Sequence, residues 1–369
     1  MAARSRAVRR LLGLLALSGL CACSVLGPLG SPDGNVRDQV STAQIVSVTH
    51  APLQTRQFAH VGASVEVLGE LQVLSAQHEN TFSDIAQRHN LGYQELRAAN
   101  PEVDPWLPGH GTPVYLPTLR VIPDAPRDGV VINLPSMRLL YFDAAGTPNT
   151  RPTVSSHPVG IGREGWATPT GAMKVTQKTR NPTWYPPASV RAEHAAAGDP
   201  LPVAVPPGPD NPLGLFRLRL SRPNYLLHGT NKPAGVGMRV SHGCIRLYPD
   251  DIEALFEQVA VDTPVYIVNQ PVLAGWRDDR LYLEVHQPLV EDERDLARDA
   301  DRVIAAALQR GGVPHTEPDA ALIDQLVRER RGLPVPILGG PESLDAYLAD
   351  ARVIGNSTPP SALGTTASR

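Results

Sequence analysis

SHGCIRL, residues 241–247, is the stretch around which this sequence is organised. Cys244 within it is the only cysteine beyond residue 23, and His228 lies a short way upstream in the segment 227–230 (LHGT). A β-type apolar run precedes the stretch, and a helical pattern follows it from residue 249. Cys244 is therefore predicted to lie where a strand or loop meets the next element, a common position for reactive groups.

A cysteine needs a base or a positive neighbour to serve as a nucleophile at neutral pH. The pKa of a free thiol is about 8.5, so only a few per cent is thiolate. The imidazole of His228 could take the proton and later return it to a leaving amine. Gly243 would let a substrate approach the backbone, and the N–H of Cys244 could then face a developing oxyanion.

Two other interpretations of Cys244 were weighed against this one. A lone cysteine is most often an inert, buried small hydrophobe, but the Ser, His and Gly neighbours here are not core formers. A zinc site made of His228, His242 and Cys244 is the second alternative. The spacing lacks a CxxC or HxxxH pair, so we expect neither a metal nor another cofactor.

The segments 227–230 and 239–247 together resemble the signature of the L,D-transpeptidases of the YkuD type. The resemblance implies that Cys244 is the nucleophile and His228 the general base. His242 occupies a position where relatives also carry Lys, which implies that it is not the essential base.

The resemblance covers residues 129–269 and implies a mainly β, sandwich-like catalytic domain. Local patterns agree, because 129–134 and 138–142 have the composition of a hairpin and 250–259 has one apolar helical face. Arg246 is similar to a residue thought to hold a substrate carboxylate, and Trp184 lies among prolines as a candidate cleft wall. The substrate-binding residues predicted in this way are Arg246, Ser241, His242, Gly243, Gly229 and Trp184.

Length and composition set broader limits on the molecule. A chain of 369 residues suggests two or three domains. The net charge of −3 gives no sign of a nucleic-acid partner. The 37 prolines and the aromatic content of 5% favour long ordered loops around a β-rich core over a helix bundle.

Residues 1–23 have the features of a lipoprotein signal peptide. Arginines are followed by an apolar stretch, 11–20, that is too short to span a membrane comfortably. The end of the segment looks like a lipobox with Cys23 as the acylated residue, and plain secretion is the alternative. Cys244 would then be the only thiol left, and no internal disulfide could form. Residues 24–71 are predicted to be a tether and lead-in.

Residues 72–117 are predicted to form a compact unit of strand, helix, helix and strand. Thr81 can cap the first helix with Asp84 three positions on, and Asn100-Pro101 ends the second. This order resembles LysM, a module that binds the glycan of peptidoglycan. The alternative is a structural domain that only packs on the catalytic one.

Residues 270–369 are predicted to be a C-terminal helical extension without catalytic residues. A strand is expected at 280–286, amphipathic helices are expected around 296–308 and 322–327, and the tail is expected to be disordered from Gly355. The chain as a whole is thus predicted to be α+β: a mainly β catalytic domain, a small βααβ LysM-like domain and this extension.

The family resemblance implies an exported acyltransferase that acts on peptidoglycan. It would remove the terminal D-Ala from a tetrapeptide stem through a thioester on Cys244, and then pass the acyl group to an amine of another stem or of a lipoprotein. The expected location is the periplasm, with a lipid anchor in the outer membrane more readily than the inner. The alternatives are a wall-binding protein with an inert catalytic domain and an L,D-carboxypeptidase that uses water as acceptor.

Overall fold

The computed structural model describes residues 57–59, 64–143 and 153–356 of the chain. The predicted signal peptide with Cys23 and the first part of the tether lie outside the described residues. Within the described part, no helix is both long enough and apolar enough to cross a membrane.

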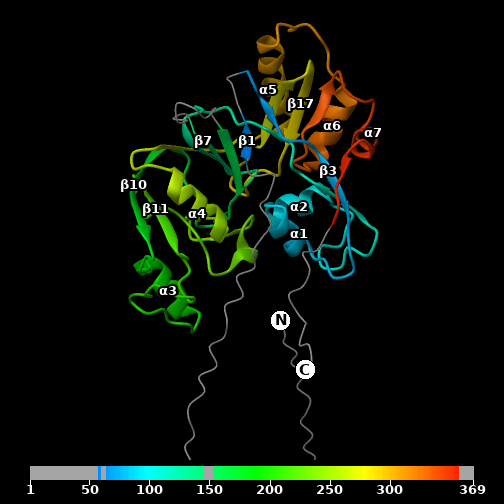
Figure 1. Ribbon diagram of the computed structural model, residues 1–369. Helices are drawn as coiled ribbons and strands as arrows, with labels where there is room; N and C mark the ends of the chain where they lie inside the picture. Colours follow the sequence, from blue (N-terminus) through cyan, green and yellow to red (C-terminus); the bar gives the residue numbers. More distant parts are fainter. Residues whose placement is uncertain (1–56, 60–63, 144–152, 357–369) are drawn as a thin grey trace, which may run out of the picture. The chain divides into compact units, whose positions relative to one another are not determined.

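A nine-stranded mixed sheet forms the domain that is predicted to be catalytic (Figure 1). Its strands are β1 (Gln57–Ala59), β6 (Gly129–Asn133), β7 (Arg138–Asp143), β8 (Thr153–Pro158), β10 (Gly171–Arg180), β11 (Phe216–Leu220), β12 (Leu226–His228), β14 (Ile245–Arg246) and β15 (Pro264–Val268). They are arranged in the order β1-β8-β7-β6-β15-β10-β11-β12-β14. The predicted hairpin is therefore β6–β7, and the SHGCIRL stretch lies at the β14 edge.

The long strand β10 joins the two halves of this sheet. Its first residues pair with β15 and its later residues pair with β11, with an irregularity in register at Thr176. Apolar residues of both halves, such as Ile132 and Leu218, share one hydrophobic core. Helix α4 (Pro249–Gln258) adds Ile252 and Leu255 to that core, as the sequence predicts. Full burial of each such side chain stabilises the fold by about 1.5–3 kcal/mol.

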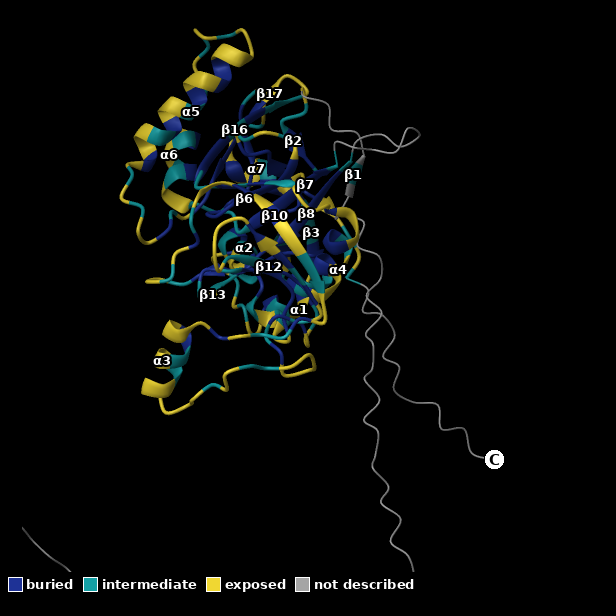
Figure 2. Ribbon diagram, turned by 90° about the vertical axis from the view of Figure 1, so that its left-hand side faces the viewer, coloured by how far each residue is buried: buried dark blue, intermediate teal, exposed yellow. Residues whose placement is uncertain are grey.

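Shorter elements surround the sheet. They are β9 (Ile161–Gly162), α3 (Ala188–Ala196), the 3₁₀ turn η1 (Pro233–Gly235) and β13 (Arg239–Ser241), with β9 paired to β13. Only Val190 of α3 is buried, and Figure 2 shows the helix largely exposed. The sequence analysis did not predict α3, because a helix with one buried residue lacks the apolar periodicity that reveals helices.

Residues 72–117 form a βααβ unit made of β3 (Gln72–Ser75), α1 (Phe82–Arg88), α2 (Tyr93–Ala99) and β4 (Pro113–Leu116). The predicted order of elements is confirmed. The cap is confirmed as well, because the Asp84 N–H donates to Thr81 Oγ1 at 3.2 Å and the Thr81 N–H donates to Asp84 at 3.0 Å. Phe82 and Leu96 are fully buried in the unit's own core.

Buried polar contacts join the βααβ unit to the catalytic sheet. Glu95 of α2 forms ion pairs with Arg138 of β7 and with Arg120. The Asn90 side chain donates to the Ser156 carbonyl at 3.1 Å, and the Tyr248 hydroxyl donates to the Leu91 carbonyl at 3.0 Å. The unit therefore shares a polar interface with the domain that carries Cys244.

The C-terminal residues form more than a helical extension. Its elements are β16 (Val272–Arg277), β17 (Arg280–Val285), α5 (Leu296–Arg310), α6 (Ala320–Glu329), β18 (Val335–Leu338), α7 (Leu344–Ala349) and β19 (Arg352–Val353). Strands β16, β17 and β18 make an antiparallel sheet whose core includes residues of α5 and α6. The predicted strand and helices are present, whereas β18 and β16, which has six residues like the predicted β17, were not predicted.

Strands at the two ends of the described chain pair with strands that are distant in the sequence. Strand β1 pairs with β8, and β2 (Val67–Leu68) pairs with β5 (Arg120–Val121), so the lead-in is partly built into the fold. Strand β19 pairs in parallel with β3 of the βααβ unit. The Asn356 amide then donates to the Ser75 carbonyl at 2.8 Å, at a position where the sequence predicts disorder.

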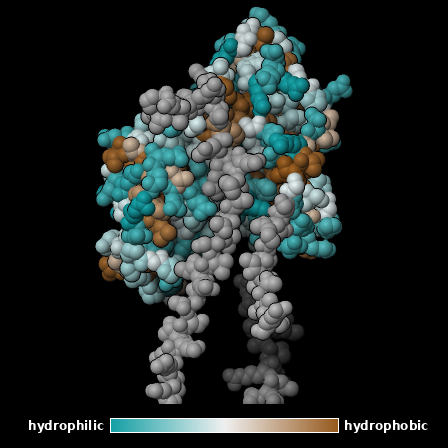
Figure 3. All heavy atoms as spheres, in the orientation of Figure 1, coloured by the Kyte–Doolittle hydropathy of each residue, from teal (hydrophilic) through white to brown (hydrophobic). Residues whose placement is uncertain are grey.

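Figure 3 shows one face of the molecule, where hydrophilic residues prevail and hydrophobic ones gather in small separate patches.

Candidate active site

The site is built on the parallel pair β12–β14, where Leu227 lies opposite Ile245 and His228 lies opposite Arg246. Side chains alternate between the two faces of a strand, and residues paired across strands share a face. His228, Arg246 and Cys244 therefore lie on one face, while Leu227 and Ile245 enter the core. The structure thus brings the predicted nucleophile, base and carboxylate-binding residue onto the same side of the sheet.

The His228 imidazole is neutral and held in one orientation. Its Nδ1 lies 2.6 Å from the Gly229 carbonyl, which can only accept, so Nδ1 carries the hydrogen and Nε2 is left to take up a proton. Burial lowers the pKa of His228 to about 4, and the positive charge of Arg246 acts in the same direction. The imidazole is therefore unprotonated at neutral pH.

Cys244 is half-buried, and at neutral pH it is a thiol. Its Sγ lies 3.5 Å from the Asn224 carbonyl, to which the S–H donates. Burial raises the pKa of Cys244 to about 11, against the smaller opposing effects of the Leu226 backbone and Arg246. Because the resting thiol keeps its proton at neutral pH, a base has to remove that proton for the sulfur to attack.

The turn that presents Cys244 is fixed by two hydroxyl groups. Ser241 Oγ donates to the Cys244 carbonyl at 2.6 Å and accepts from the Gly243 N–H at 3.1 Å. Thr168 Oγ1 donates to the Gly243 carbonyl at 3.0 Å. Gly243 has φ +99°, a conformation that favours glycine, and a Cβ at this position would lie 3.0 Å from the Tyr225 ring. The predicted residues Ser241 and Gly243 thus shape the loop that holds the sulfur.

Comparison with known proteins identifies the family. The model of the L,D-transpeptidase catalytic domain YkuD matches residues 127–267, and the L,D-transpeptidase C-terminal domain matches 274–337. The probable L,D-transpeptidase YbiS of Escherichia coli K12 is 39% identical over 278 residues, which cover 73% of this chain and 88% of that protein. The chain belongs to the L,D-transpeptidase family.

A second relative agrees with this assignment. The probable L,D-transpeptidase YcfS of Escherichia coli K12 is 41% identical over 258 residues, 69% of this chain and 79% of that protein. Among solved structures, L,D-transpeptidase 3 from Mycobacterium tuberculosis matches 39% of this chain and 62% of its own, at 18% identity and a TM-score of 0.28. The protein is accordingly an L,D-transpeptidase enzyme, and this family acts on peptidoglycan stem peptides.

In this L,D-transpeptidase, the His242 side chain contacts the helix α3. Its Nε2 lies 3.2 Å from Glu193 of α3, and its ring meets Trp166 edge-on at 4.8 Å between centroids. Glu193 also forms an ion pair with Arg163. Sequence reasoning missed this cluster because its residues are far apart in the chain. A role for His242 in substrate binding stays a prediction.

Trp184 and Gly229 are placed differently with respect to the site. Gly229 supplies the carbonyl that fixes the His228 ring. Trp184 is half-buried, and its backbone exchanges hydrogen bonds with Val205 at 2.9 and 2.8 Å. No hydrogen bond, ion pair or ring contact of the described residues joins Trp184 to Cys244, and its role as a cleft wall stays a prediction.

Two arginines on the sheet face that carries Cys244 were missed by the sequence analysis. Arg217 and Arg219 of β11 pair with His228 and Leu226 of β12, so they share the face that carries Cys244. The alternation FRLRL showed a half-exposed strand, but the sequence did not tell which strand lies beside it. Among the described residues, no group of three His, Cys, Asp or Glu side chains is arranged to hold a metal.

Proposed function

We propose that this L,D-transpeptidase is an exported cysteine acyltransferase that replaces the terminal D-Ala of a tetrapeptide stem with an amine of a second substrate. The observation that carries the proposal is the shared sheet face of His228 and Cys244, with the His228 ring neutral and its Nε2 available. A neutral imidazole and a neutral thiol on one face of a sheet are a pair that can generate a thiolate when substrate arrives.

In the first half-reaction, His228 Nε2 takes the proton of Cys244 and Sγ attacks the carbonyl carbon after the third stem residue. The N–H of Cys244 is the proposed donor to the oxyanion. The C–N bond then breaks, His228 returns the proton to the amine of D-Ala, and a thioester remains on Cys244. Arg246 is the proposed partner of the leaving carboxylate, because its charge acts on both His228 and Cys244.

In the second half-reaction, an amine attacks the thioester. His228 takes a proton from that amine, the C–S bond breaks, and the proton returns to the Cys244 sulfur. The acceptor amine belongs to another stem or to a lipoprotein in this proposal. Water in the same position would yield a free carboxylate, which is the carboxypeptidase reaction.

The βααβ unit is proposed to bind the glycan of peptidoglycan. Trp106 is 69% exposed, and its ring lies 6.4 Å from that of Tyr93, so the unit presents aromatic surface of the kind that sugar rings pack against. A structural role alone is the competing proposal, supported by the ion pairs of Glu95. Binding of the isolated glycan to wild type and to Trp106→Ala separates the two.

Export and lipid anchoring rest on the sequence of residues 1–23. We propose that Cys23 is acylated and that the mature protein is held at a membrane facing the periplasm, with the outer membrane favoured. Labelling with a fatty acid in cells expressing wild type or Cys23→Ala tests the anchor. Loss of label in the variant is expected, and equal label in both would contradict acylation at Cys23.

Incubation with purified tetrapeptide muropeptides, followed by mass spectrometry of the products, tests the proposed reaction. Wild type is expected to release D-Ala and to form cross-linked dimers, while Cys244→Ala and His228→Ala form neither. Release of D-Ala with only tripeptide products would identify a carboxypeptidase. Cross-linking by Cys244→Ala would contradict the mechanism, and failure of wild type to cleave or to react with a carbapenem would indicate an inert wall-binding protein.

A further inference from the structure

The site face of the sheet carries two mainly polar rows of residues that run across its strands. One row contains Gln177 of β10, Arg219 of β11 and Leu226 of β12, and Cys244 directly precedes β14 on the same face. The neighbouring row contains Thr179, Arg217, His228 and Arg246. The register therefore places three arginines on the same face as the nucleophile.

Within the part of the chain that the structure describes, these three arginines have no carboxylate partner. Among the ion pairs of the described residues, none involves Arg217, Arg219 or Arg246, although Arg163 and Arg239 nearby are paired with Glu193 and Glu291. The Nε atoms of Arg217 and Arg246 are buried and have no hydrogen-bond partner. Guanidinium groups bind carboxylates strongly, and leaving them unpaired beside a nucleophile suits an anionic ligand.

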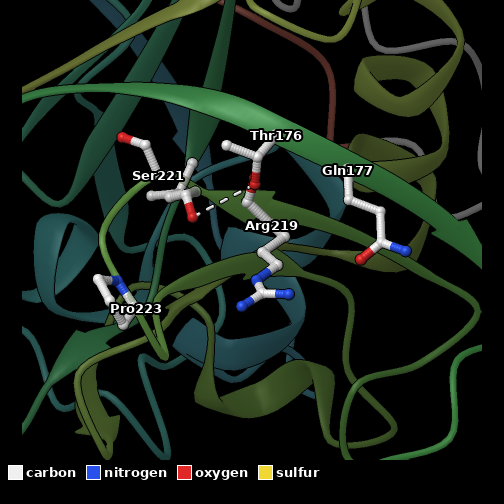
Figure 4. Close-up of a pocket in the computed structure, with 6 residues that line it drawn as sticks. Thr176, Gln177, Arg219, Ser221 and Pro223 are labelled. Carbon is white, nitrogen blue, oxygen red and sulfur yellow. Dashed lines mark hydrogen bonds between the residues drawn. The ribbon is translucent and has the colours of Figure 1, made fainter.

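Arg219 lines a hollow at the β10–β11 end of this face (Figure 4). The hollow measures about 530 Å³ and is lined by Thr176, Gln177, Arg219, Leu220, Ser221 and Pro223. Figure 4 shows the Arg219 and Gln177 side chains extending on the same side of their strands, as their pairing requires. The register irregularity at Thr176 places this residue beside Gln177, and Thr176 Oγ1 donates to the Arg219 carbonyl at 3.2 Å.

The hollow is two strands away from Cys244 across the sheet, and one of its lining residues adjoins a contact of the sulfur. Pro223 precedes Asn224, whose carbonyl accepts from Cys244 Sγ at 3.5 Å. Strands β11 and β14 are separated by β12 alone, so their backbones are roughly 10 Å apart. A carboxylate bound by Arg219 would therefore lie several bonds from the reacting carbonyl, whereas the leaving carboxylate lies closer and is assigned to Arg246.

We propose that Arg219, with Gln177 beside it and Arg217 in the next row, forms a second carboxylate subsite that binds a peptide stem at a carboxylate remote from the bond being cleaved. This inference deepens the proposed function and rests on it. Stem peptides of either substrate can carry such a carboxylate. The donor and the acceptor are therefore the two sources that an experiment must separate.

The test uses stem peptides with the remote carboxylate free or converted to an amide, presented once as donor and once as acceptor. D-Ala release without acceptor reports on the donor, and transfer of the acyl group at saturating donor reports on the acceptor. The variants are Arg219→Gln, Arg219→Lys and, as matched control, Arg180→Gln. Arg180 lies on β10, points to the opposite face beside Phe216 and Phe256, and forms an ion pair with Glu257.

The expected result is a rise of about tenfold in KM for the free-acid peptide in one of the two roles on Arg219→Gln, with kcat changed less than about twofold. Arg219→Lys recovers part of the loss. Amidation of the carboxylate raises the KM of wild type by a similar factor and does not raise the KM of Arg219→Gln further. The role in which this occurs, donor or acceptor, identifies the source of the carboxylate.

Two outcomes would overturn the subsite while leaving the proposed function intact. One is that amidation of the peptide raises KM by the same factor in an active wild type and in Arg219→Gln. The other is that Arg219→Gln and Arg180→Gln behave alike on every peptide. If wild type turned over no stem peptide in any form, the proposed function would be contradicted, and the subsite would fall with it.

Discussion

Two groups of arginines in this molecule lie in contrasting surroundings. Arg120 and Arg138 are buried where the βααβ unit meets the catalytic sheet, and both form ion pairs with Glu95. Arg217, Arg219 and Arg246 lie half-buried or exposed on the site face, and none of them forms an ion pair among the described residues. The first group is neutralised within the protein, and the second is available to a ligand.

The surroundings of Glu95 show what neutralisation requires. Burial alone would raise the pKa of Glu95, but Arg120, Arg138 and the Gly92 N–H bring it below its ordinary value. Burial lowers the pKa of Arg138 to about 10, which leaves its guanidinium charged at neutral pH. A buried charge is tolerated when its partners are in place. The unpaired arginines keep access to solvent, which reduces this cost until a substrate supplies the anion.

The largest expected effect is a loss of stability when the buried Arg120 and Arg138 lose their anionic partner. Glu95→Ala leaves two buried guanidinium groups without their anion, so the free energy of unfolding should fall by about 3–5 kcal/mol. Urea denaturation measures this change. Glu257→Ala is the control, because its ion pair with Arg180 is more than half exposed and should contribute at most about 1 kcal/mol. Equal losses in the two variants would contradict a structural role for the buried pair.

Arg246→Gln should impair activity and leave stability nearly unchanged. It removes the proposed partner of the leaving carboxylate, and the rate of D-Ala release should fall about 10- to 150-fold, as expected for a lost hydrogen bond to a charged group. Because Arg246 has no ion pair in the described structure, the free energy of unfolding should change by less than about 1 kcal/mol. A large loss of stability together with normal D-Ala release would place Arg246 with Arg120 and Arg138, whose role is structural.

The site and the Glu95 interface also differ in the pH range over which they affect stability. His228 has a pKa of about 4 in the folded protein, below the roughly 6.5 of an unfolded histidine. The unfolded state therefore binds more protons between these values, and stability falls as the pH is lowered from about 6.5 to 4. Glu95, with its lowered pKa, contributes stability above the ordinary carboxyl pKa, and this is lost only at lower pH.

Unfolding free energies measured between pH 7 and 4.5 should therefore decline less steeply in His228→Gln than in wild type, by up to about 1.4 kcal/mol per pH unit. His89 provides a useful comparison, because burial lowers its pKa to about 4 as well and His89→Gln should flatten the curve similarly. Identical slopes for wild type and His228→Gln would contradict a neutral, buried imidazole.

The smallest effect is expected for Arg219. Its side chain is exposed and unpaired, so Arg219→Gln should change the free energy of unfolding by less than about 0.5 kcal/mol. Thermal or urea denaturation of the same preparation used for kinetics measures this. A loss of several kcal/mol would assign Arg219 to the fold and not to substrate binding.

The sequence predicted the parts of the fold that are specified by neighbouring residues. The end of α2, the Thr81 cap and the helix after Cys244 all follow from local patterns. The pairing of β19 with β3 could not be predicted, because two short segments from opposite ends of the chain carry no mutual signal. The length of the catalytic sheet and the position of β1 at its edge depend on tertiary contacts of the same kind.

The site was predictable only in part, because local motifs show some of its residues and tertiary contacts bring in the others. Cys244 and His228 lie in short motifs that the sequence displays directly, and the β12–β14 pairing brings them onto one face. Arg217 and Arg219 are visible as an alternating strand, but their relevance depends on β11 lying beside β12. Glu193 of α3 and Trp166 reach His242 from separate parts of the chain, which no local pattern reveals.

Trapping the acyl-enzyme tests the central claim most directly. Wild type is mixed with a tetrapeptide donor in the absence of an acceptor, and the intact protein and its peptides are weighed by mass spectrometry. The account predicts a tripeptide acyl group on Cys244, one D-Ala released for each adduct, and greatly slowed adduct formation in His228→Gln. An adduct on another residue, or undiminished D-Ala release by Cys244→Ala, would contradict it.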